Sequence, residues 1–236
     1  MPDDSLVITL DVDWAPDFMI DAAAEALAAG GARATWFVTH ASPAIDRLRE
    51  RPDLFELGIH PNFLPGTTHG DDPVAHLLEI VPGARCARTH SLMQSTPLLE
   101  RLMAGGIEVD CSLLLPRHPG LRPVRHVSQG GSLTRVPFIW EDDLEMERDD
   151  PIWSVNGLLA LGEGLKVLDF HPVHAWLNSA SFAAYAALRG RLGQVTEDEV
   201  AALRHDGPGA ATLFAEVVAH LASHGGGRRV ADVIGT

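Results

Sequence analysis

The chain has 236 residues, of which 46% are hydrophobic and 21% charged, and its formal net charge is −14. This length allows one domain with a sizeable core, and an α/β barrel of this size needs no second domain. The acidic balance argues against a nucleic-acid-binding protein, which would show a basic face. We therefore expect a single globular domain over residues 1–236 that does not bind nucleic acid.

Three features of the sequence bear on the compartment. The first residues, MPDDSLVITLDVD, contain neither a basic segment nor an apolar stretch of signal-peptide length. No apolar run approaches the roughly 18 residues needed to cross a bilayer. Cys86 and Cys111 lack CxxC spacing, which favours buried thiols in a reducing compartment. We expect a cytoplasmic protein without a membrane span.

Along the chain, short apolar or β-branched runs alternate with Ala- and Leu-rich segments of helical spacing. The expected strands are residues 6–11, 34–39, 54–59, 85–89, 107–110, 133–139 and 165–170. The expected helices are residues 19–29, 43–50, 72–81, 97–104 and most of roughly the last sixty residues, with a break at 206–209. Repeated βα units of this kind imply a parallel sheet, either open or closed into a barrel.

The groups that follow the expected strands favour the barrel. Polar or aromatic side chains stand at or just after the ends of all seven runs: Asp11 and Asp13, His40, His60, Arg88 and His90, Asp110, residues 140–142, and His171 with His174. An open sheet concentrates its ligand-binding groups at one switch point, whereas a barrel gathers them from every strand end onto one rim. The sequence therefore predicts a distorted (β/α) barrel with about seven parallel strands.

Asp11-Val12-Asp13 is the most informative segment. Residues i and i+2 of a strand share a face, so both carboxylates would point the same way at the end of the strand. One carboxylate can then bind a metal ion while the other takes a proton from the water that the metal activates. The same pair also suits a turn or a helix cap, which is common after a strand.

Three further side chains suit hydrolytic chemistry. His60, followed by Pro61, ends the third strand, and imidazole with carboxylate suits zinc or a similar divalent ion. His171 follows an apolar strand and could protonate a leaving amine. Arg88 could hold one aspartate ionised by charge pairing. The alternatives are a histidine bonded to backbone for His60 and a surface salt bridge for Arg88. The chain has no GxSxG, GxxxxGK[ST] or HExxH motif.

These residues, in this order, resemble the polysaccharide deacetylase family (the NodB-homology domain, carbohydrate esterase family 4). The resemblance covers Leu6 to about His174 and implies a distorted barrel of about seven strands with one divalent ion, usually zinc. The segment TLDVD resembles the first family motif, which would make Asp11 the catalytic base and Asp13 the first metal ligand. Arg88 matches the arginine that pairs with the base, and His171 matches the general acid.

The second family motif is a histidine pair, H-x-x-x-H, and here the chain departs from it. His60 matches the first position, but the second is Leu64, which cannot bind a metal. His69 could replace it if the loop folds back, and Asn62 could add an oxygen. We favour Asp13, His60 and His69 as the ligands of the ion.

The resemblance implies an enzyme that removes an acetyl group from an N-acetylated sugar. The runs GIHPNFLPG, RTHSLMQS and FHPVHAWLN look similar to a branch of the family that is linked to bacterial surface-polysaccharide gene clusters. Trp14, Trp140 and Trp176 lie near strand ends, where they could stack on a sugar or simply pack beneath loops. Two alternatives stay open: a metal-dependent amidohydrolase acting on a small non-sugar amide, and a non-catalytic carbohydrate-binding relative.

Overall fold

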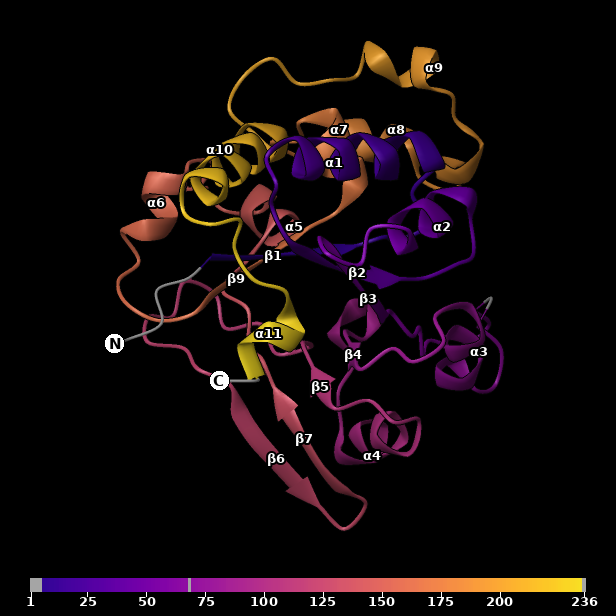
Figure 1. Ribbon diagram of the computed structural model, residues 1–236. Coiled ribbons are helices and arrows are strands. Elements are labelled where there is room, and N and C mark those ends of the chain that lie inside the picture. The colour runs from indigo at the N-terminus through magenta and orange to yellow at the C-terminus, as the bar shows by residue number, and fades with distance from the viewer. Residues whose placement is uncertain (1–5, 68, 235–236) are drawn as a thin grey trace.

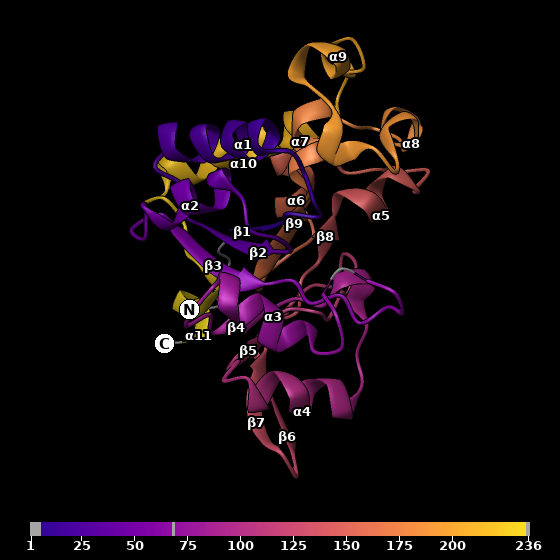
Figure 2. The same ribbon diagram turned by 90° about the vertical axis from the view of Figure 1, so that its right-hand side faces the viewer.

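The computed structural model describes residues 6–67 and 69–234, and within them nine strands form one sheet surrounded by helices (Figures 1 and 2). The strands are β1 (Leu6–Asp11), β2 (Ala34–Val38), β3 (Phe55–Ile59), β4 (Cys86–Ala87), β5 (Val109–Asp110), β6 (Val124–Ser128), β7 (Gly131–Arg135), β8 (Trp140–Glu141) and β9 (Lys166–Phe170). The α-helices are α1 (Asp17–Ala29), α2 (Pro43–Arg49), α3 (Pro73–Ile80), α4 (Thr96–Ala104), α5 (Asp142–Met146), α6 (Val155–Leu159), α7 (Pro172–Leu177), α8 (Ala183–Leu188), α9 (Glu197–Ala201), α10 (Ala210–Ser223) and α11 (Val230–Ile234). Short 3₁₀ turns, η1 (His90–Leu92) and η2 (Leu192–Gln194), follow β4 and α8.

The sheet curls into a distorted barrel, as the sequence predicts. Its order is β6-β7-β5-β4-β3-β2-β1-β9-β8, and every neighbouring pair is parallel except the β6–β7 hairpin. Residues 131–141 run from β7, beside β5, to β8, beside β9. Between these strands the amide of Val136 donates to the carbonyl of Asp110 (2.9 Å), and the amide of Ile139 donates to that of Val167 (3.0 Å). One segment thus joins both sides of the curled sheet.

The strands differ from the expected ones in two respects. All seven expected runs contribute to the sheet, but those at 85–89 and 107–110 shrink to the two-residue strands β4 and β5. The hairpin partner β6 was not expected, because its residues are exposed or only half-buried and show no apolar face. Figure 1 shows β6 beside β7, at the end of the sheet. The two-residue strand β8 was not expected either. The expected helices at 19–29, 43–50, 72–81 and 97–104 are present, and the predicted break at 206–209 directly precedes α10. The last part of the chain is less helical than expected, because loops separate α8, α9, α10 and α11, and α5 and α6 were not expected.

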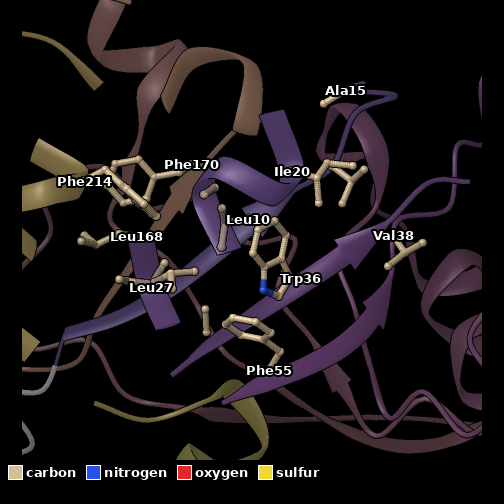
Figure 3. Packing of buried hydrophobic residues seen from close by; sticks show 14 of the residues in the cluster. Leu10, Ala15, Ile20, Leu27, Trp36, Val38, Phe55, Leu168, Phe170 and Phe214 are labelled. Carbon is tan, nitrogen blue, oxygen red and sulfur yellow. The ribbon is translucent and has the colours of Figure 1, made fainter. Parts of the chain in front are cut away.

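The alternation of side chains along β1 separates the inside of the barrel from its outside. Leu6, Ile8 and Leu10 belong to the large hydrophobic cluster beneath the helices, where Figure 3 shows Leu10 near Trp36. Val7 belongs instead to the inner cluster, with Phe37, Cys86, Phe138 and Val167 among others. Because the period of a strand is two, Thr9 and Asp11 share the face of Val7. The interior therefore changes from apolar to polar toward the carboxyl end of β1.

The helices complete the core on the outside of the sheet. α1 and α10 both contact α7, and the three lie together above β1 and β9 in Figure 1. Both cysteines are buried and free, as expected. Among the described residues, no helix combines the length and apolar character that crossing a bilayer requires.

Candidate active site

The carboxyl ends of the strands bring most of the expected site residues together. Asp13 lies beyond β1 in a left-handed backbone conformation (φ 41°), and His60 directly follows β3. Arg88 follows β4, and His171 follows β9. Parallel strands present their carboxyl ends at one rim, so residues far apart in the sequence converge there.

Asp13, His60 and His90 form a group that fits a metal ion. The Oδ1 atom of Asp13 lies 3.2 Å from Nε2 of His60 and 3.2 Å from Nδ1 of His90. The two imidazole nitrogens are 3.3 Å apart. Ligand atoms about 2.0–2.1 Å from a tetrahedral zinc lie about 3.3–3.4 Å from one another, so these three atoms have the spacing of three corners of such a site.

Local charge favours the ligand form of Asp13. Burial raises the pKa of its carboxyl, but hydrogen bonds from His60 and His90 and the charges of nearby histidines outweigh burial and hold the pKa well below its ordinary value. On the far side of His60, Nδ1 faces Oδ2 of Asp11 at 3.5 Å and has no other partner among the described residues. A carboxylate on the far nitrogen of a metal-binding imidazole fixes the orientation of the ring. Asp11 is in this position relative to His60.

His90 takes the place that we expected His69 to fill. The amide of His90 donates to the carbonyl of Pro61 (3.0 Å), which holds the segment after β4 against the segment after β3. This bond places His90 beside His60. The sequence shows a histidine after the fourth strand but no motif that makes it a ligand, because His60 and His90 are 30 residues apart.

The structure does not bring His69 into the group. Its Nδ1 accepts a hydrogen bond from the amide of Asn62 (3.0 Å), and its Nε2 lies 2.8 Å from the carbonyl of Thr39, to which it donates. With both ring nitrogens bonded to backbone, His69 has no lone pair free for a metal. The side-chain oxygen of Asn62 is likewise taken by the amide of Leu64 (2.9 Å).

Two other clusters of carboxylates and histidine are less suited to a metal ion. Asp11, Asp169 and His171 lie close together, but the guanidinium of Arg88 binds both carboxylates and supplies the positive charge there. Asp142 and Asp143 also approach His171, but Nδ1 of that histidine is already bonded to Asp142. The group of Asp13, His60 and His90 is therefore the best candidate metal site in the described part of the chain.

Arg88 is completely buried and bonded at every edge of its guanidinium. Nη1 donates to Asp11 (2.8 Å) and to Asp169, Nη2 donates to the hydroxyl of Thr9 (2.9 Å), and Nε donates to the carbonyl of Cys111 (3.1 Å). The sequence predicts the pairing with an aspartate, and the structure contains it. The predicted alternative, a surface salt bridge, is wrong because the arginine lies inside the barrel.

Aromatic rings enclose the same guanidinium. Its central carbon lies 4.6 Å from the ring centroid of Phe37 and 4.4 Å from that of Phe138. Arginine stacks on aromatic faces through its flat, delocalised cation, and burial strengthens this attraction. The rings and the hydrogen bonds together fix the position of Arg88, and Arg88 in turn fixes that of Asp11.

Asp169, the fourth residue of β9, is the second carboxylate on Arg88, and no sequence motif singles it out. Burial raises the pKa of Asp169 well above its ordinary value, against the lowering effect of the Arg88 charge. Its Oδ2 atom is buried and has no hydrogen-bond partner among the described residues. The guanidinium of Arg88 therefore counteracts the effect of burial at Asp169 while it also pairs with Asp11.

His171 is held by the N-terminus of α5. Asp142 accepts a hydrogen bond from the amide of His171 through Oδ2 (2.8 Å), and its Oδ1 lies 2.6 Å from Nδ1 of the ring. The opposite nitrogen, Nε2, points toward the metal group and lies 3.7 Å from Oδ2 of Asp13. Burial lowers the pKa of His171, but the charges of Asp142 and Asp143 and the hydrogen bond to Asp142 raise it well above its ordinary value. A protonated imidazole so placed can donate a proton into the site.

Comparison with known proteins gives the family. The model of WbmS-like polysaccharide deacetylases matches residues 8–189. A solved structure of a proposed polysaccharide deacetylase involved in O-antigen biosynthesis in Bordetella bronchiseptica is 31% identical, with a TM-score of 0.81, over 93% of this chain and 91% of its own. A proposed polysaccharide deacetylase from Mycobacterium smegmatis is 17% identical, with a TM-score of 0.56, over 96% of this chain and 87% of its own, a likeness of fold alone. No curated protein sequence matches the chain. Because the family model covers well over half of the sequence, the chain belongs to the WbmS-like polysaccharide deacetylases.

Proposed function

We propose that this chain is a metal-dependent hydrolase that removes the acetyl group from an N-acetylated sugar. The observation that carries the proposal is the convergence of a candidate ligand group, Asp13, His60 and His90, with a carboxylate and a protonated histidine at one rim. Asp11 faces His60 of this group and His171 faces Asp13, so a base and an acid are both available for amide hydrolysis.

The ligand set suits a divalent ion, and two imidazoles with one carboxylate favour zinc. When bound, such an ion polarises the acetyl carbonyl and makes a water molecule more acidic. Asp11, oriented by Arg88, is placed to accept the proton of the attacking water. Nε2 of His171 is placed to protonate the sugar nitrogen as its bond to the acetyl carbon breaks. The products are acetate and a free amino sugar.

The Bordetella relative and the two cysteines support a proposal for the substrate and its compartment. The Bordetella relative is described as acting in O-antigen biosynthesis, so we propose that this chain acts on a precursor of a bacterial surface polysaccharide. Two free, buried cysteines suit a reducing compartment, which fits a precursor made in the cytoplasm. We also propose that the chain forms a single catalytic domain.

A missing H-x-x-x-H pair would favour the non-catalytic relative, because it removes a metal ligand. Leu64, at the second position of that pair, is 42% exposed. His90 offers a third ligand from the neighbouring strand, so the absence of a histidine at position 64 no longer counts against a metal. The hydrolase is therefore the function that the geometry supports best.

Metal content should decide between His90 and His69. We expect about one equivalent of zinc or another divalent ion in the parent protein and in His69→Ala, and a loss of the ion in Asp13→Ala, His60→Ala and His90→Ala. Mass spectrometry of protein purified without chelators measures this, and circular dichroism controls for folding. Metal kept in His90→Ala but lost in His69→Ala would return the third ligand to His69.

Acetate release should identify the substrate class. We expect the zinc-loaded protein to release acetate from N-acetylhexosamine glycosides or nucleotide-linked N-acetylated sugars, and not from simple amides such as N-butylacetamide. Coupled enzymatic detection of acetate measures this. Release from the simple amides alone would indicate the non-sugar amidohydrolase. No release from any of them after loading with zinc, cobalt or manganese would contradict a catalytic role.

A further inference from the structure

A cavity of about 440 Å³ opens beside Asp13. Its lining includes Trp14 after β1, Tyr185 of α8, and Arg191 and Gln194 on the segment that follows α8. Ligand sites in proteins are commonly about 300–1,000 Å³ and combine aromatic walls with a few polar groups. This cavity has that size and composition, and it reaches the candidate metal group through Asp13.

Trp14 forms one wall from an unusual backbone conformation. Both Asp13 (φ 41°) and Trp14 (φ 56°) are left-handed, a region that bulky residues rarely adopt. The amide of Trp14 donates to the hydroxyl of Thr39 (3.2 Å), which secures this turn. Strained backbone at a functional site commonly holds a side chain in a required position. Here it holds the half-buried indole of Trp14 in the lining of the cavity.

Two histidines support the indole from the protein side. The ring of His90 meets it edge-on at 5.2 Å, and the ring of His69 lies 5.7 Å away at an interplanar angle of 35°. His69 is itself fixed by its bonds to the amide of Asn62 and the carbonyl of Thr39. The indole of Trp14 therefore lies against two rings, one of which, His69, is held by backbone hydrogen bonds.

Tyr185 is supported in the same way. Its ring lies 5.2 Å from that of His174, a buried histidine whose Nε2 is 2.9 Å from Asp143 and whose Nδ1 is 3.0 Å from the hydroxyl of Ser179. The cavity therefore has two aromatic side chains, from different parts of the chain, that rest on histidines fixed by hydrogen bonds. Such preorganised aromatic rings lose little freedom when a ligand binds.

The other tryptophans at strand ends cannot serve this purpose. Trp140 is fully buried and donates its indole N–H to the carbonyl of Ile152 (3.1 Å). Trp176 is 7% exposed and packs edge-on against Phe18. Of the three tryptophans that the sequence places near strand ends, Trp14 is the one that lines the cavity.

We propose that Trp14 and Tyr185 form the subsite that binds the pyranose ring of the substrate, with its acetamido group directed toward Asp13. The apolar C–H face of a pyranose matches an aromatic face, and Arg191 and Gln194 offer hydrogen-bond donors to its hydroxyl groups. This inference rests on the proposed function and specifies its substrate as a sugar recognised through its ring. Such stacking acts on bound substrate and transition state alike, so it sets KM more than kcat.

Saturation-transfer NMR on metal-free protein, with the methyl glycosides of N-acetylglucosamine and N-acetylgalactosamine as probes, tests the subsite without catalysis. We expect the parent to bind at least one glycoside, Trp14→Phe to keep most of this affinity, and Trp14→Ala and Tyr185→Leu to raise Kd roughly tenfold. Phe18→Leu, which alters an aromatic residue outside the cavity lining, is the control and should bind like the parent. Circular dichroism shows whether each variant is folded.

Absence of binding to the parent, or equal binding by folded Trp14→Ala, overturns the subsite. Acetate release with an unchanged KM in Trp14→Ala also overturns it while leaving the proposed function intact. Binding that depends on Trp14, without acetate release from any sugar, supports the subsite and refutes the hydrolase. The two proposals can therefore fail independently.

Discussion

Replacing Arg88 by methionine is expected to destabilise the folded chain by about 3–5 kcal/mol at neutral pH. The guanidinium is completely buried and is the cation bonded to both Asp11 and Asp169. Methionine fills much of the same volume but leaves Asp11 and Asp169 in the barrel without the guanidinium that pairs with both of them. Urea unfolding followed by circular dichroism measures the loss. Arg47→Met, which removes an exposed ion pair with Asp21, is the control and should change stability little.

The loss in Arg88→Met should depend on pH. Asp169 already has a raised pKa in the folded protein, and removal of the Arg88 charge raises it further. A carboxyl with a raised pKa in the folded state favours folding below its unfolded pKa of about 3.9, and this contribution disappears as the pH rises through the folded pKa. The stability difference between parent and variant should therefore be large at pH 7 and smaller at pH 5. An equal difference at both values would contradict the arrangement of charges described above.

Much of this barrel could be predicted from the sequence, because buried parallel strands leave a clear pattern. The runs at 6–11, 34–39 and 165–170 carry apolar residues on both faces, and each contains a fully buried strand in the structure. The hairpin β6–β7 could not be predicted in the same way. One of its strands packs no side chain into the core, so its pairing depends on backbone bonds that leave no hydrophobic period.

Site residues could be predicted where they lie at the end of a single strand. They could not be predicted where two separate segments of the chain bring their side chains together. Asp11 and Asp13 share one strand end, and the sequence indicates them directly. The proximity of His90 to His60 depends on the pairing of β3 with β4 and on the bond between His90 and Pro61. The partnership of Asp142 with His171 likewise depends on the approach of α5 to the end of β9. Spacing within a single loop, the pattern that suggested His69, carries no information about such contacts.

Replacing His171 by glutamine is expected to lower kcat by about 10²–10⁴-fold, because the departing amine would lose its proton donor. Glutamine keeps a polar side chain of similar reach but cannot deliver a proton at neutral pH. The rate of acetate release at saturating substrate measures the effect on the sugar that the substrate panel identifies. Unchanged kcat in a folded His171→Gln variant would remove His171 from the reaction.

The pH profile of Asp142→Asn should show how His171 is tuned. Burial alone lowers the pKa of this imidazole, and the charge and hydrogen bond of Asp142 are main causes of its raised value. The asparagine variant should therefore lower the pKa of His171 and move the alkaline limb of the kcat profile to lower pH, since the general acid is active only when protonated.

Asp143→Asn is the matched control from the same turn of α5. Its carboxylate is 4.0 Å from Nδ1 of His171 and its side chain is 41% exposed, so solvent screens its charge and the limb should move less. A larger shift of the limb in Asp143→Asn than in Asp142→Asn would show that the exposed carboxylate of Asp143, and not the buried Asp142, raises the pKa of His171. The hydrogen bond between Asp142 and His171 would then not explain how the general acid stays protonated.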